Sequence, residues 1–187
     1  MSSPTPPTVP ATALSKGPTS TQLSCALVIG TNAISSSFPP NQPFYWWVVV
    51  SLKDLSIAVN ETAPAGSVPP DVSALANNPD YFLFLIANNQ NGAGIPSGAQ
   101  YTFLQSVGSG AGLGAIEQMV GQLSANAFGT LTYVLASTML QQDISGFESW
   151  SYFGDSVLTM QFLPVQINGQ WSYTPVQQPA YSLQQAA

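Results

Sequence analysis

The strongest strand signal in the chain lies at residues 44–52, which read FYWWVVVSL. Aromatic and β-branched residues fill this segment, and both types favour the pleated, half-buried surface of a β-sheet. Trp46 and Trp47 are adjacent, so a strand directs them to opposite faces of its sheet. The core needs only one of them. The other must be covered by a second layer, a partner subunit or a ligand, and we take both as candidate assembly residues.

The same reasoning predicts strands on both sides of this segment. Segment 81–87 (YFLFLIA) is apolar throughout, which indicates a strand covered on both faces. Asn168 and Gly169 separate the last two apolar runs, and Asn-Gly between such runs is a strong hairpin signal. The full set of expected strands, besides 44–52, is 23–30, 55–60, 81–87, 101–107, 130–138, 155–163 and 170–174.

One helix is expected at 115–126, where apolar residues recur at helical spacing on one face. These residues are Ile116, Met119, Val120 and Leu123. Strands separated by loops rich in proline, glycine and asparagine, with one short helix, predict a mainly β fold. We expect an antiparallel β-sandwich of jelly-roll or Ig-like type.

The two ends of the chain differ in composition from the middle. Residues 1–22 are rich in proline, serine and threonine, and bury too little apolar area to offset their ordering entropy. We interpret them as a flexible, extended N-terminal arm that is either a tail or a segment that orders against a neighbouring subunit. Pro4, Pro6 and Pro7 are its candidate assembly contacts. Residues 23–174 then form a single sandwich domain, and 175–187 form a C-terminal tail.

The composition excludes many kinds of chemistry. The 187 residues include two lysines, no arginine, no histidine and eight acids, for a formal net charge of −6. Two cations neutralise too few phosphates for a nucleic-acid partner. Without histidine there is no Ser-His-Asp relay, and Cys25 is the only cysteine available to a metal site. We therefore expect a protein that is not an enzyme and that has no cofactor and no metal.

The start of the chain lacks the basic and apolar regions of a signal peptide. No stretch reaches the roughly 18 apolar residues of a membrane helix, so no transmembrane segment is expected. These features predict a cytoplasmic protein, one released by a non-classical route, or part of a particle.

A glycine-rich segment, 108–114 (GSGAGLG), precedes the expected helix. Gly110, Gly112 and Ala115 match the G-x-G-x-x-A spacing of dinucleotide-binding turns. The chain shows only one strand-helix-strand passage and lacks the acidic residue that would hold a ribose. We therefore interpret the segment as a flexible loop that admits tight turns before a helix.

Acids and aromatics gather at 141–155 (QQDISGFESWSYFGD). Aromatic rings beside carboxylates and amides are typical of surfaces that stack on sugars. The candidate ligand-binding residues are Asp143, Glu148, Trp150, Tyr152 and Asp155. A structural role in the core or at an interface remains the alternative.

A charge-poor, amide-rich surface offers little repulsion between copies and lowers the desolvation cost of packing them together. We therefore predict a self-associating structural protein that forms a filament, shell or inclusion-type assembly, with itself as main partner. Two alternatives stay open. The first is a carbohydrate-binding module of lectin or adhesin type, with glycans as partners. The second is a membrane-active toxin subunit that uses residues 108–127.

Overall fold

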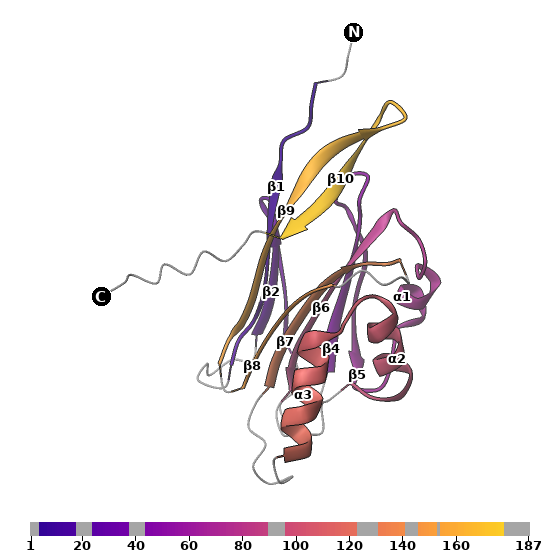
Figure 1. The fold of residues 1–187 in the computed structure, drawn as a ribbon. Coiled ribbons are helices and arrows are strands. Elements are labelled where there is room, and N and C mark those ends of the chain that lie inside the picture. The colour runs from indigo at the N-terminus through magenta and orange to yellow at the C-terminus, as the bar shows by residue number, and fades with distance from the viewer. Residues whose placement is uncertain are drawn as a thin grey trace, which may run out of the picture.

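The computed structural model describes residues 4–17, 24–37, 44–89, 96–122, 131–140, 146–152 and 154–177. Two five-stranded antiparallel sheets pack face to face as a sandwich, and short helices lie on the outer side of one of them (Figure 1). The prediction of a mainly β antiparallel sandwich is confirmed.

The first sheet has the strand order β10-β9-β1-β2-β3. Its central strand β1 pairs with β2 on one side and with the first half of β9 on the other. The second half of β9 continues into a hairpin with β10, which projects beyond the sandwich (Figure 1). The strands are β1 Val9–Ser15, β2 Ser24–Ile29, β3 Asn32–Ser37, β9 Ser156–Ile167 and β10 Gln170–Gln177.

The second sheet has the order β5-β4-β6-β7-β8. Its three central strands are the most apolar segments of the chain, and they are buried almost throughout because both faces are covered. The strands are β4 Phe44–Ser51, β5 Ile57–Pro64, β6 Tyr81–Asn89, β7 Leu131–Thr138 and β8 Phe147–Tyr152.

Three helices cover the outer face of the second sheet (Figure 1): α1 Pro70–Ala74, α2 Gly98–Ser106 and α3 Ala111–Gln122. Val72 of α1, Leu104 of α2 and Ile116 of α3 are fully buried in one cluster with the sheet. No helix in the described part of the chain is long and apolar enough to span a membrane.

The adjacent tryptophans of β4 belong to two different hydrophobic cores, one between the sheets and one between the second sheet and the helices. Trp46 packs between the sheets and donates its Nε1–H to Asn60 Oδ1 at 2.7 Å. Trp47 faces the helices, where its ring meets the edge of Phe103 at a centroid distance of 5.8 Å. The second layer that covers Trp47 is therefore the helical layer. With 1% and 0% of their surfaces exposed, neither tryptophan presents an assembly surface, which corrects their candidate role.

The boundary of the N-terminal arm is also corrected. Val9–Ser15, placed in the arm by composition, forms the central strand β1 of the first sheet. Its small residues Ala11, Ala13 and Ser15 point inward and are buried, so the strand packs closely on the second sheet. Residues 4–8 have no regular structure and extend away from the sandwich (Figure 1).

At the other end, the strand β10 runs on through Gln177, so the first three residues of the expected tail belong to the sandwich. Residues 178–187 lie outside the described residues.

The expected strand at 101–107 is wrong, because this segment is most of the helix α2. Phe103, Leu104 and Val107 are buried at intervals of one and three residues, which places them on one helical face. The helix expected at 115–126 begins four residues earlier, as α3 Ala111–Gln122, and residues 123–126 lie outside the described residues. Strands β3 and β8 were not predicted.

Candidate functional site

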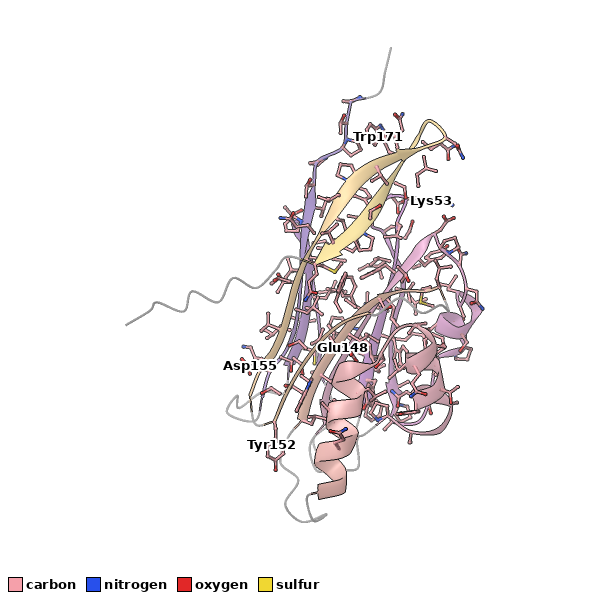
Figure 2. The ribbon with its side chains drawn as sticks, in the orientation of Figure 1. Lys53, Glu148, Tyr152, Asp155 and Trp171 are labelled. Carbon is pink, nitrogen blue, oxygen red and sulfur yellow. The ribbon has the colours of Figure 1, made fainter. Side chains whose placement is uncertain are left out.

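Three of the five candidate ligand residues share one face of the edge strand β8. Glu148, Trp150 and Tyr152 alternate along the strand and pair with residues of β7 that face the helices. These side chains therefore lie on the helix-covered side of the second sheet. Glu148 and Tyr152 are labelled in Figure 2.

Glu148 is the centre of a cluster of four hydrogen bonds. Its Oε1 accepts hydrogen bonds from the Tyr133 hydroxyl at 2.5 Å and the Ser109 hydroxyl at 2.8 Å. Its Oε2 accepts from the backbone N–H of Gly112 at 2.8 Å and of Gly110 at 3.2 Å. The carboxylate thus joins β8 and β7 to the segment that opens α3.

The backbone N–H groups in this cluster belong to the start of α3. The first N–H groups of a helix lack partners within the helix and carry partial positive charge, so they favour an anion. A Cβ atom at Gly112 would lie 3.0 Å from the carboxyl carbon of Glu148, so glycine permits the close approach. The anion at this glycine-rich loop is therefore a side chain of the protein itself, which explains the loop without a bound phosphate.

Tyr133 is buried beneath this carboxylate. Burial raises the pKa of its hydroxyl well above the ordinary value of 10.0, and the nearby charge of Glu148 raises it further. The hydroxyl therefore remains protonated and acts as a donor to Glu148. Ser109 and Tyr133 are both buried, and their hydrogen bonds with Glu148 hold the start of α3 against the sheet.

The remaining ligand candidates do not join this cluster. Trp150 is half-buried against the helix-side core, and Tyr152 is half-buried at the end of β8. Asp155 lies just before β9 of the first sheet, where its Oδ1 accepts a hydrogen bond from the Gly17 N–H at 2.6 Å. Asp143 lies outside the described residues. The carboxylates of Glu148 and Asp155 thus accept hydrogen bonds at two separate places in the fold.

Cys25 is buried between the sheets and donates a long hydrogen bond to Ser15 Oγ at 3.8 Å. Burial raises the pKa of its thiol from 9.0 to about 12, so the sulfur stays protonated and unreactive near neutral pH. Among the described residues, no group of three His, Cys, Asp or Glu comes together in a way that could hold a metal ion.

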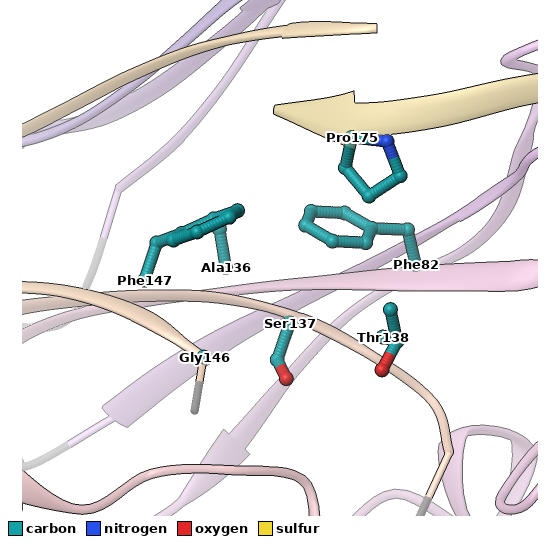
Figure 3. Close-up of a pocket in the computed structure, with 7 residues that line it drawn as sticks. All are labelled: Phe82, Ala136, Ser137, Thr138, Gly146, Phe147 and Pro175. Carbon is teal, nitrogen blue, oxygen red and sulfur yellow. The ribbon is translucent and has the colours of Figure 1, made fainter. Parts of the chain in front are cut away.

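A small cavity of about 110 Å³ lies between the two sheets, near the end of β10. Figure 3 shows the rings of Phe82 and Phe147 near Pro175, with the hydroxyls of Ser137 and Thr138 pointing away from the rings. The Ser137 hydroxyl is occupied, since it donates to the carbonyl oxygen of Val107. The cavity is therefore apolar and small.

A larger, open cleft of about 420 Å³ lies at the end of the sandwich from which the β9–β10 hairpin projects. It is lined by the entry to β1, by the β2–β3 turn, by the β4–β5 turn and by Tyr173 of β10. The lining residues are Pro7, Thr8, Val9, Pro10, Ile29, Gly30, Thr31, Asn32, Asp54, Leu55 and Tyr173. None of these residues was predicted as a ligand site, and no motif in the sequence marks them, because the cleft is formed by four distant segments.

No protein-family model matches the chain, and a search of curated protein sequences gives no match either. Function must therefore be argued from the residues and their arrangement.

Proposed function

We propose that the protein is a non-enzymatic structural subunit that self-associates through the outer face of its first sheet. One observation carries this proposal. The strands β1, β2, β3, β9 and β10 contain no Asp, Glu, Lys or Arg. The large hydrophobic side chains that are exposed in the described part of the chain all lie in these strands: Val28, Val157, Leu163, Ile167 and Val176.

The strand register places these side chains on one face. Val28 lies opposite Thr12, and Thr12 lies opposite Thr159. Thr159 is two residues after Val157, so both point the same way. Leu158 lies between Val157 and Thr159, and Met160 follows Thr159. Both point inward and are buried.

The projecting hairpin continues the same face. Val176 lies opposite Gln161 of β9. Leu163 and Ile167 are two and six residues after Gln161, so they point to the same face of the strand. The intervening positions Phe162 and Pro164 point toward the second sheet, and Phe162 is fully buried. The outer face is thus a continuous surface of aliphatic, threonine, serine and glutamine side chains.

A sheet face left in water usually alternates polar and charged residues, and exposed strands carry lysine as protection against pairing. The second sheet differs in two ways. Helices cover its outer face, and its edge strands β5 and β8 contain the acids Glu61 and Glu148. No described helix covers the outer face of the first sheet (Figure 1). A face without charge requires no complementary charge on its partner, and it costs less free energy to desolvate than a charged face does.

A second copy of this chain is the partner that this face fits. The chain has a formal charge of −6, but its described acids lie outside the strands of the first sheet, so two such faces meet without ionic repulsion. Five strands about 4.8 Å apart and about 23 Å long give a footprint on the order of 500 Å². The hairpin extends this footprint toward the ~800 Å² per partner of stable interfaces.

Charged substitutions on the face test the proposal. Val28→Lys and Val157→Lys each put a desolvation cost and a like-charge contact into a two-fold interface, so we expect each to shift the protein to monomer in sedimentation velocity. Ala74→Lys, at an exposed position of α1, is the matched control and should leave the assembly unchanged. Circular dichroism confirms that each variant is folded. Assembly that survives both face substitutions would overturn the proposal.

A further inference from the structure

The open cleft at the projecting end of the sandwich has the form of a preformed binding site. Its walls come from separate parts of the chain, and backbone hydrogen bonds hold them together. Gly30 N–H donates to the carbonyl oxygen of Pro10 at 2.8 Å, and Tyr173 N–H donates to that of Leu52 at 2.7 Å. A cleft whose walls are already ordered avoids most of the entropy cost of arranging them around a ligand.

The cleft combines an aromatic ring with polar groups of several kinds. Tyr173 supplies the ring, Thr31 a hydroxyl, Asn32 an amide and Asp54 a carboxylate. Trp171 lies two residues before Tyr173 on the same face of β10, so aromatic surface continues along the hairpin beside the N-terminal segment (Figure 2). A ring with convergent hydroxyl, amide and carboxylate groups suits a ligand that has both an apolar face and many hydroxyls.

Two hydrogen bonds from Ser56 fix the carboxylate of Asp54 at the cleft. Its Oδ1 accepts from the Ser56 N–H at 3.0 Å and from the Ser56 hydroxyl at 2.6 Å. These bonds lower the pKa of the carboxyl group, so it is ionised near neutral pH. Both of these hydrogen bonds go to Oδ1.

The charge of the lining restricts the ligand. Among the described residues that line the cleft, Asp54 and the Tyr173 phenol are the only ionisable groups, and none is a lysine. A phosphate, sulfate or carboxylate group would meet a negative charge with no cation to balance it. The volume of about 420 Å³ lies within the range of small-molecule sites.

We propose that this cleft binds one or two rings of a neutral carbohydrate. Tyr173 stacks against the apolar face of a ring, while Asp54 and Asn32 bond to its hydroxyls. This site is separate from the outer face of the first sheet and does not depend on self-association.

The test is binding of the full chain to an array of neutral oligosaccharides of glucose, galactose, mannose and N-acetylglucosamine, followed by calorimetry with the tightest. Asp54→Asn replaces the charged carboxylate by a neutral amide, and Asn32→Ala removes an amide from the cleft. We expect each variant to bind about tenfold more weakly. Asp71→Asn, at an exposed position of α1, is the matched control and should bind as the unmodified chain does.

Three outcomes would overturn the proposal. They are an array with no bound neutral sugar, sugar binding that neither cleft variant weakens, and binding of a small organic cation such as spermidine in place of sugars. The Val28→Lys variant separates this proposal from self-association, because it should lose assembly and keep sugar binding. Thermal unfolding of each variant shows whether a loss of binding reflects a loss of folding.

Discussion

The carboxylate of Glu148 accepts a hydrogen bond from the backbone N–H of Gly112 at 2.8 Å, across 36 positions of sequence. This contact connects the edge strand β8 to the first turn of α3. Hydrogen bonds to an ionised acceptor are stronger than neutral ones, and here the acceptor also meets the positive end of the helix dipole. Glu148 is therefore the residue that attaches the helical layer to this edge of the second sheet.

Replacing Glu148 should destabilise the protein. Glu148→Ala leaves the hydroxyl of Tyr133 and two N–H groups of the helix start without their acceptor, so we expect a loss of about 1–3 kcal/mol. Glu148→Gln keeps the shape but loses the charge, and should cost less. The midpoint of urea unfolding measures both. Glu61→Gln on the edge strand β5 is the matched control, and an equal loss there would contradict this role for Glu148.

Two neighbouring glycines of α3 should respond to alanine in opposite directions. At Gly112 a Cβ atom would lie 3.0 Å from the Glu148 carboxyl carbon and 3.1 Å from its Cβ, so Gly112→Ala should displace the carboxylate and destabilise the fold. At Gly114 nothing lies within 4 Å, so Gly114→Ala should stabilise by up to about 1 kcal/mol through helix propensity. Thermal or urea unfolding of the two variants compares them directly. A stabilised Gly112→Ala would show that Glu148 is not held tightly.

The parts of this cluster were visible in the sequence, but their meeting was not. The glycine-rich segment before a helix and the acid Glu148 were each singled out, the first as a turn-rich loop and the second as a ligand residue. Their contact depends on β8 pairing with β7 and on α3 covering that face, which is long-range packing. The spacing of residues along the chain does not indicate this contact.

The sequence predicts the fold correctly where the composition of a segment is enough to determine its structure. FYWWVVVS and YFLFLIA are apolar enough to be buried on both faces, and they form the central strands β4 and β6. Asn168 and Gly169 adopt positive φ angles of 51° and 79°, as a tight hairpin turn requires.

The prediction failed where tertiary packing decides the structure. Val9–Ser15 is rich in small residues and follows several prolines, yet it pairs with β9 about 150 residues away. The helix α2 contains Tyr101 and Phe103, and Val107 follows at its C-terminal end. The alternation of these three residues with polar ones resembles a strand. Burial of both Phe103 and Leu104 against the second sheet favours the helix.

Cys25 should be protected from thiol reagents in the folded protein. Burial raises the pKa of the thiol from 9.0 to about 12, so the reactive thiolate is scarce, and the sulfur is also inaccessible. We expect slow reaction with a disulfide reagent in buffer and rapid reaction in urea. Rapid reaction of the folded chain would contradict the burial.

The same shift predicts a loss of stability at alkaline pH. Above about pH 9 the unfolded chain releases the thiol proton while the folded chain retains it, so the unfolded state gains and stability falls as pH rises toward 12. Tyr133 acts in the same direction above pH 10, because its pKa is also raised. The midpoint of urea unfolding should decrease steadily across this range. A midpoint that stays constant would exclude both groups as buried acids.

Trypsin distinguishes the observed β1 from a flexible arm. The only lysines are Lys16 and Lys53. Lys16 directly follows the central strand β1, and the next residue, Gly17, is bonded to Asp155. Lys53 lies in an exposed turn with 65% of its side chain accessible. We expect cleavage after Lys53 to precede cleavage after Lys16, as followed by mass spectrometry. Rapid release of residues 1–16 would contradict the central position of β1.

The central claim is that the outer face of the first sheet is covered by a second copy of the chain. Light scattering of the unmodified protein across a hundredfold dilution, with electron microscopy of the same samples, tests it most directly. We predict dimers or larger regular assemblies that persist at low micromolar concentration, because the face carries no charge and exposes Val28, Val157 and Ile167. A monomer at every concentration would contradict the claim.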